Sequence, residues 1–131
     1  MTNFKTVNPT TIRAPFGNYV HGIEAPAGSR LFFTSGQLGT GKDDATPESI
    51  TEQATICFTN IQEILKANAL TMADVVKVTA YVTSRDYFPA YMAVRDQFLP
   101  QPVASTLLIV GGFTRPEFKV EVEVIAVTSE I

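Results

Sequence analysis

The sequence predicts an α+β fold in which two helices cover one face of a mixed six-stranded sheet. Two segments have helical periodicity and six have the composition of strands, in the order β-β-β-α-β-α-β-β. Two amphipathic helices can cover only one face of such a sheet. The other face is half apolar, and a monomer would expose it as an unusually large patch. We therefore expect the chain to form an oligomer through that face.

Length and composition describe one domain over residues 1–131. The chain has 45% hydrophobic and 18% charged residues, which is typical of a compact protein. No apolar run approaches the roughly 20 residues of a membrane span, and no basic leader precedes an apolar segment at Met1, so we expect a cytoplasmic protein without membrane partners. The net charge is −3 and the ten Lys and Arg residues are scattered, which argues against binding of nucleic acid.

The N-terminal third contains three predicted strands, at residues 4–7, 20–25 and 31–35. The third has apolar residues on both faces, so we expect it to be central in the sheet. It ends at Gly36-Gln37, where a ligand can approach the backbone closely. A loop delivers Tyr19, which is either a packed aromatic or a site group. His21 is the only histidine and has no partner at metal-ligand spacing, so no metal site is expected.

The first helix is predicted to begin at Thr46-Pro47-Glu48, with Thr46 as the N-cap. It is expected to end near Asn68, which can adopt a left-handed cap. Cys57 lies on its apolar stripe, so we interpret it as a core residue rather than a nucleophile. The stripe consists of apolar residues at helical spacing: Ile50, Ala54, Cys57, Phe58, Ile61, Ile64 and Leu65.

A one-turn capping box is predicted at residues 71–74, followed by a strand over 75–83. Its Val76, Val78, Ala80 and Val82 are assigned to one face, and Lys77, Thr79 and Tyr81 to the other. The second helix, over residues 87–99, is expected to be capped by Asp86. Its inner side carries Phe88, Tyr91 and Phe98.

Two further strands are predicted at the C-terminus, over residues 103–110 and 119–127, with a bend at Gly111-Gly112 between them. In the last strand, apolar and charged residues alternate almost perfectly. Val120, Val122 and Val124 must face one way, and Lys119, Glu121 and Glu123 the other. The valines suit a core covered by helices. The face with two carboxylates suits a wall shared with another subunit.

Four segments, together with the order of elements, resemble the RidA/YjgF family, which is also known as the endoribonuclease L-PSP family. They are Gly17-Asn18-Tyr19, Phe33-Thr34-Ser35-Gly36-Gln37, residues 74–82 and residues 120–127. The resemblance covers nearly the whole chain. It implies a chorismate-mutase-like fold and a homotrimer with helices outside, sheets around a central barrel, and ligand clefts between subunits.

The resemblance also implies an activity, because the deaminase branch of the family hydrolyses enamines or imines to keto acids and ammonia. An arginine in a Pro-x-Arg-Ser/Thr motif holds the substrate carboxylate, and a glutamate on the last strand positions or activates water. Pro102-Val103-Ala104-Ser105 places Ala104 where that arginine would stand. Alanine cannot bind a carboxylate, and losing a charge-assisted pair removes roughly 1.5–3 kcal/mol or more of anchoring.

Carried over residue by residue, the resemblance predicts Glu121 and Thr106 as catalytic residues. Thr106 shares a strand face with Ala104, so it should face the cleft. Phe88 could equally be part of the plain core, and strand alternation alone could explain Glu121. No cofactor and no metal are expected. The predicted substrate-binding residues are Tyr19, Ser35, Gly36, Phe88, Ala104, Ser105 and Arg115.

Three interpretations are open. The first, which we favour, is a hydrolase or deaminase whose substrate is neutral near Ala104, or is held by Arg115 or Arg30. The second is a protein that binds a small metabolite in the trimer cleft without catalysis. The third is a ribonuclease, as the older family label suggests. The acidic balance and the absence of a basic track argue against it.

Overall fold

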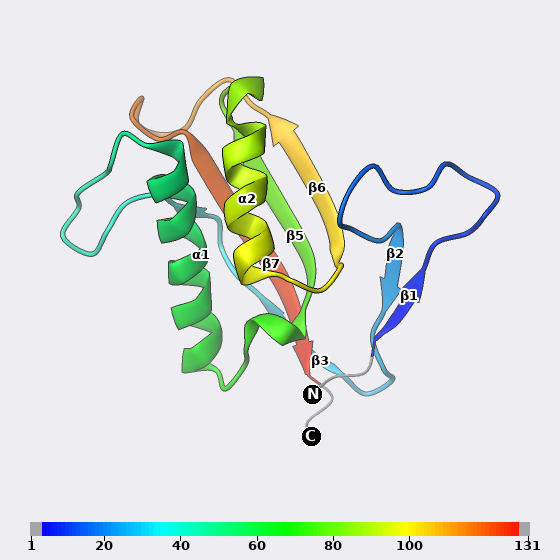
Figure 1. Cartoon of the computed structure of the whole chain (residues 1–131). Coiled ribbons are helices and arrows are strands. Elements are labelled where there is room, and N and C mark those ends of the chain that lie inside the picture. The colour runs from blue at the N-terminus through cyan, green and yellow to red at the C-terminus, as the bar shows by residue number, and fades with distance from the viewer. Residues whose placement is uncertain (1–3, 129–131) are drawn as a thin grey trace.

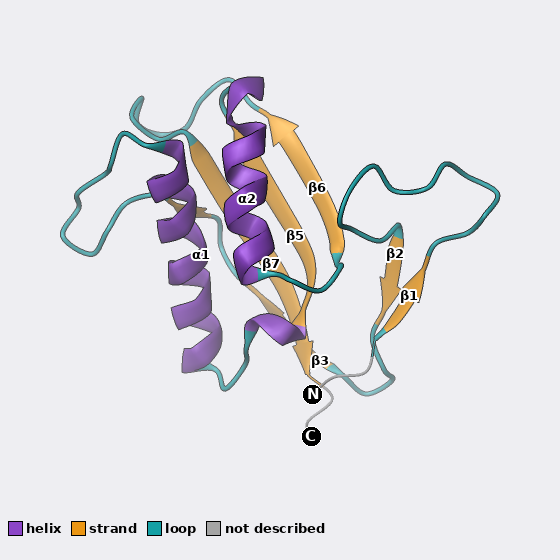
Figure 2. Cartoon of the chain, viewed as in Figure 1, coloured by secondary structure: helices purple, strands orange, loops and turns teal. Residues whose placement is uncertain are grey.

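The computed structural model describes residues 4–128 and has an α+β fold (Figures 1 and 2). Its main sheet is mixed and five-stranded, with β5 (Val75–Val82) and β6 (Ala104–Ile109) parallel and the other pairs antiparallel. The strand order is β3-β7-β5-β6, where β3 is Arg30–Phe33 and β7 is Val120–Thr128. A short strand, β4 (Gln37–Leu38), pairs with the N-terminal part of β7. Both helices lie on one face of this sheet, as expected (Figure 1).

The expected six-stranded sheet is wrong, because the first two strands form a separate hairpin. Among the strands within residues 4–128, β1 (Lys5–Val7) pairs only with β2 (Gly22–Glu24), and each is three residues long. A single bridge between Val20 and Ala104 joins this arm to β6, and the Val20 amide donates a hydrogen bond of 3.1 Å to the Val103 carbonyl oxygen. Pro9 and Pro15 lie between the two strands and cannot donate to a ladder, which limits longer pairing.

The position of β3 also differs from the prediction, because it is an edge strand rather than a central one. Phe32 packs against the core on the helix side. Leu31 and Phe33 point to the opposite face and are 63% and 64% exposed. This strand has apolar residues on both faces because one face packs on the core and the other carries large, exposed hydrophobic side chains.

The helices occupy the predicted segments with shifted ends. α1 spans Ile50–Ala67, and its N-cap is Ser49, whose Oγ accepts a hydrogen bond of 3.2 Å from the Glu52 amide; Thr46 was the wrong cap. Asn68 has a φ of −113° and Ala69 takes the left-handed conformation instead, with a φ of 58°.

α2 spans Phe88–Phe98 and follows a 3₁₀ turn, Arg85–Tyr87. That turn is capped by Ser84 rather than by Asp86, because the Ser84 Oγ accepts a hydrogen bond from the Asp86 amide. The predicted capping box is confirmed at the 3₁₀ helix Met72–Asp74. The inward aromatic side of α2 is also confirmed, since Tyr91 is buried and Phe98 stacks on Phe58 with ring centroids 5.4 Å apart.

The core lies between the helices and the valine face of the sheet, as predicted. Val120, Val122 and Val124 are buried, and their partners on β5 are Val82, Ala80 and Val78. One core position was missed from the sequence. Gln53 on α1 is fully buried, and its amide makes three hydrogen bonds to the backbone of Pro47, Glu117 and Lys119. These three hydrogen bonds connect the loops at one end of the sheet to α1 and satisfy the buried amide.

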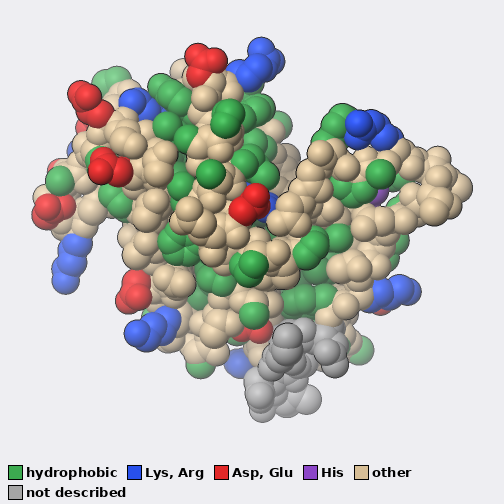
Figure 3. Space-filling view, viewed as in Figure 1, with side chains coloured by type: hydrophobic (Ala, Val, Ile, Leu, Met, Phe, Trp, Pro, Cys, Tyr) green, Lys and Arg blue, Asp and Glu red, His purple; other side chains and the backbone are tan. Residues whose placement is uncertain are grey.

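The other face of the sheet, called the open face below, carries no described helix. Register places there Leu31, Phe33, Lys77, Thr79, Tyr81, Ala104, Thr106, Leu108, Glu121, Glu123 and Ile125. On the helix side, Lys and Arg side chains lie apart from one another (Figure 3). No helix within residues 4–128 is long and apolar enough to cross a membrane.

Candidate ligand site

The structure places the nine predicted site residues in four separate regions. Tyr19, Phe88 and Ser105 meet on the helix side of β6. Ala104 and Thr106 lie on the open face of β6, whereas Ser35, Gly36 and Glu121 lie beside β7. Arg115 belongs to the loop before β7 and pairs with Asp44 and Glu117, at 3.4 and 3.2 Å.

The helix-side region is a cavity of about 420 Å³ between the N-terminal loop, the start of α2 and β6. Tyr19 shapes the loop, because its hydroxyl accepts a hydrogen bond of 3.1 Å from the Phe16 amide. Its ring also meets His21 edge-on, with centroids 6.0 Å apart. The hydroxyls of Tyr19 and Ser105 are the polar side-chain groups of an otherwise apolar lining. The lining residues are Phe16, Gly17, Tyr19, Phe88, Met92, Ser105 and Leu107.

Glu121 lies against the backbone of Gly36 on the open face. A Cβ atom placed on Gly36 would be 2.2 Å from Oε2 of Glu121, so a side chain there would displace the carboxylate. Burial raises the pKa of the Glu121 carboxyl above its ordinary value, and the negative charge of Glu123 raises it further. No described residue donates a hydrogen bond to this carboxylate or pairs with it.

The second carboxylate of β7 is engaged with a neighbour. The Tyr81 hydroxyl donates a hydrogen bond of 3.3 Å to Oε1 of Glu123. The pKa of Tyr81 is raised, first by burial and then by the charge and the hydrogen bond of Glu123. Glu121 is therefore the carboxylate of this face that is available to a ligand or to water.

Sequence reasoning did not select Lys77, although strand parity had assigned it to this face. Lys77 is the register partner of Ala104 on β6 and of Ile125 on β7. Its Nζ donates a hydrogen bond of 2.8 Å to Oγ1 of Thr106. A cation thus lies on the open face beside the alanine.

The two halves of the open-face site are far apart within one chain. Thr106 and Glu121 lie on strands separated by β5 and are two residues out of register. Two strand spacings and two residues along a strand amount to about 12 Å. A small ligand therefore cannot contact both side chains of the same chain.

Other reactive side chains have structural surroundings. Burial, with a smaller contribution from the charge of Glu121, raises the pKa of the Cys57 thiol to about 12, and its Sγ donates to the Val120 carbonyl oxygen at 3.8 Å. This agrees with the prediction of a core cysteine. Within residues 4–128, no group of His, Cys, Asp or Glu side chains could hold a metal ion.

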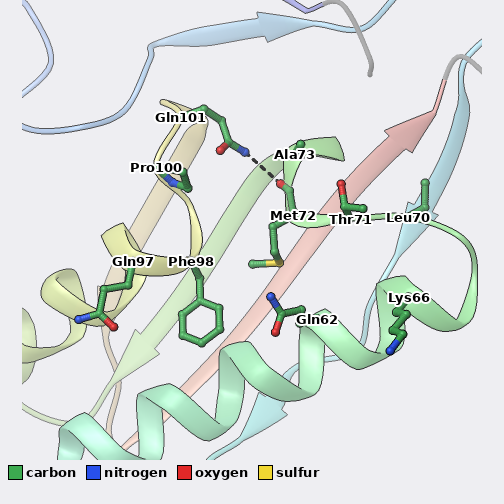
Figure 4. Close-up of a pocket in the computed structure, with 10 residues that line it drawn as sticks. All are labelled: Gln62, Lys66, Leu70, Thr71, Met72, Ala73, Gln97, Phe98, Pro100 and Gln101. Atoms are coloured by element: carbon green, nitrogen blue, oxygen red, sulfur yellow. Dashed lines mark hydrogen bonds between the residues drawn. The ribbon is translucent and has the colours of Figure 1, made fainter.

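A larger hollow, about 720 Å³, lies between the C-terminal ends of the two helices and contains none of the predicted site residues. Phe98, Met72 and Gln62 point into it (Figure 4). Gln101 closes one side, because its amide donates to the Met72 carbonyl oxygen at 2.9 Å.

The fold is that of a small α+β domain in which two helices cover one face of a mixed sheet. The opposite face carries both polar and apolar side chains and is covered by no described helix. The family model described as Endoribonuclease L-PSP matches residues 10–128. The chain therefore belongs to the RidA/YjgF/L-PSP family.

Known relatives agree with this assignment. TdcF of Escherichia coli K12, which is named provisionally as a reactive intermediate deaminase, is 33% identical over 91% of this chain and 95% of its own. A 2-iminobutanoate/2-iminopropanoate deaminase of Salmonella typhimurium LT2 is 30% identical over 94% and 97%. The solved structure of E. coli TdcF with bound serine has a TM-score of 0.73 at 27% identity, covering 95% and 99%. A Rid family protein, YyfB of Yersinia pestis, has a TM-score of 0.82 at 24% identity, covering 95% and 98%.

Proposed function

We propose that this protein is a RidA-class enzyme that hydrolyses a small imine or enamine in a cleft between subunits. The observation that carries the proposal is the Glu121 carboxylate, which lies against Gly36 with a raised pKa and without a protein partner among residues 4–128. A carboxylate whose pKa is shifted toward neutral pH is a better general base. In this position Glu121 would take a proton from the water that attacks the C=N carbon.

The proposed cleft requires two copies of the chain, because Glu121 and Thr106 are about 12 Å apart in one copy. We propose a homotrimer with the open faces around a central barrel. The exposed side chains of Leu31, Phe33 and Leu108 support an assembly that covers this face. In such an assembly, the Glu121 side of one copy would meet the Thr106 side of the next.

The substrate class follows from the relatives. One relative is named for the deamination of 2-iminobutanoate and 2-iminopropanoate, and another was solved with bound serine. All three compounds are small carboxylates with nitrogen on the adjacent carbon. Ser35 and Gly36 would line the cleft beside Glu121, whereas Tyr19, Phe88 and Ser105 border the separate helix-side cavity. The proposed compartment is the cytoplasm.

The alternative is a trimer that binds a metabolite without turning it over. Ala104 favours this alternative, because an alanine cannot hold a carboxylate where the resemblance to the deaminase branch predicts an arginine. Incubation with freshly generated 2-iminobutanoate, with release of 2-oxobutanoate as the readout, separates the two functions. Turnover above the spontaneous rate supports the enzyme, whereas saturable binding without turnover supports the binding protein.

A further inference from the structure

Lys77 lies on the open face with its side chain directed toward β6. Val78, the next residue along β5, is buried against the helices, and the register partner of Lys77 on β6 is Ala104. The hydrogen bond of 2.8 Å to Thr106 fixes where the ammonium group lies. Since Thr106 and Ala104 are two residues apart on the same face, the ammonium lies beside the small alanine side chain.

This ammonium has unused hydrogen-bonding capacity. A lysine head group has three donors, and the only partner of Lys77 among residues 4–128 is the neutral hydroxyl of Thr106. By contrast, Arg95 and Arg115 each face a carboxylate, at 2.9 and 3.2 Å. A half-buried cation without a counter-ion is unfavourable, so an incoming anion would gain more here than at a solvated lysine.

Ala104 leaves the space that such an anion needs. Directly paired residues have Cβ atoms about 5 Å apart, so a long side chain at position 104 would compete with the lysine head group for the same volume. The methyl group of alanine does not. Beside the alanine on β6, a charged side chain from β5 therefore reaches the place that a longer residue at position 104 would occupy.

We propose that Lys77 binds the carboxylate of the substrate in this chain and that Thr106 is the residue that positions its ammonium. The inference rests on the proposed function and specifies its ligands as small 2-imino, 2-oxo or 2-amino monocarboxylates. A lysine is a point charge rather than a planar fork, so it anchors the carboxylate without fixing its rotation. The site should therefore accept a wider range of side chains on the substrate than a bidentate arginine allows.

The test compares a carboxylate with its neutral amide. Affinities for 2-oxobutanoate and 2-oxobutanamide are measured by NMR titration for the wild type and for Lys77→Met, Lys77→Arg and Thr106→Val. Lys77→Met should weaken the binding of the acid about 10- to 100-fold and leave the amide within about twofold, because one charge-assisted contact is lost. Lys77→Arg should keep most of the preference for the acid. Thr106→Val should reduce it partly.

Two further variants complete the experiment. Lys66→Met, at the end of α1 beside the larger hollow, is the matched control and should change neither affinity. Ala104→Arg in the Lys77→Met background should restore the binding of the acid, because it places a cation in the same volume.

The outcomes separate the two proposals. If the wild type binds neither compound nor serine, the proposed function is wrong and the role of Lys77 falls with it. If the wild type prefers the acid and Lys77→Met keeps that preference, the function stands and the assignment of Lys77 is overturned. An equal loss of acid and amide, together with a lower Tm, would show a structural role and also overturn it. If Lys77→Met does not fold, Lys77→Gln and Thr106→Val are used instead. If both of these variants keep the wild-type preference for the acid over the amide, the assignment of Lys77 is overturned.

Discussion

Replacing Glu121 by glutamine tests whether this chain is an enzyme. The amide keeps the shape of the side chain against Gly36 but cannot accept a proton from water. General-base catalysis contributes about 10²–10⁴ in rate, so kcat should fall by that factor, or by roughly 3–5 kcal/mol of transition-state stabilisation. The affinity for 2-oxobutanoate should stay within a few-fold, because the amide keeps the shape of the side chain and Lys77 rather than Glu121 is proposed to hold the substrate carboxylate.

Glu121→Gln should raise or preserve the stability of the folded protein, whereas loss of a structural glutamate would lower it. The pKa of Glu121 is raised in the folded state, so the folded protein holds its proton more tightly than the unfolded chain does. Ionised Glu121 therefore costs stability, and the cost develops as the pH rises from the ordinary carboxyl pKa through the raised value. Glu121→Gln removes this cost, and its Tm at pH 7 should equal or exceed that of the wild type. Its Tm should also fall less than that of the wild type between pH 4 and pH 7.

The assay follows keto-acid release from 2-iminopropanoate and 2-iminobutanoate, with Tm measured on the same samples. In the wild type, kcat/KM should rise with pH as Glu121 loses its proton, and the midpoint of that rise should lie above the ordinary carboxyl pKa. Glu123→Gln is the matched control, because it neutralises the neighbouring carboxylate of the same face while its amide oxygen can still accept the hydrogen bond of Tyr81. That variant should keep substantial turnover. Full turnover in folded Glu121→Gln protein would refute the enzymatic role, and a marked loss of Tm would indicate that Glu121 is structural.

Three other predictions concern the core, the assembly and the substrate range. Gln53→Ala leaves the backbone partners of three hydrogen bonds unsatisfied, so the free energy of unfolding should fall by about 2–4 kcal/mol in urea titrations; exposed Gln62→Ala should change it by less than about 0.5 kcal/mol. Light scattering should give the mass of a homotrimer at micromolar concentration, which Phe33→Glu should reduce; a monomeric wild type would contradict the assembly. In the Lys77→Met background, Ala104→Arg should raise turnover of 2-iminobutanoate severalfold, and turnover unchanged by this second substitution would show that a cation at position 104 does not anchor the substrate.

Local patterns predicted much of the fold. The alternation over residues 119–127 predicted which face of β7 is buried, because successive side chains on a strand point to opposite sides. Val120 and Val122 are buried, whereas Glu121 is on the open face. The segments of both helices followed from apolar periodicity. Their first residues did not, because Thr46 and Ser49 are both competent caps and local sequence does not choose between them.

Parity also placed Lys77 on the polar face of its strand and Thr106 on the same face as Ala104. Their pairing could not be predicted, because it depends on β5 and β6 being adjacent and parallel in one particular register. Similarly, the residues that resemble the family motifs were found from the sequence, but their division into separate regions was not.

The sequence by itself determined the α+β class, the two helical segments, the buried face of β7 and of β5 from Val78 onward, and the presence of a carboxylate and a lysine on the opposite face; a bulge before Lys77 buries Val75 in place of the predicted Val76. These features depend on neighbours within a few residues, whose geometry is that of the helix or the strand. Only the tertiary structure decided that β3 is an edge strand, that β1 and β2 form a separate hairpin, and that the Lys77 ammonium lies beside Ala104. Those features depend on pairings between segments tens of residues apart, and a one-residue change of register would move every side chain of a strand to the other face.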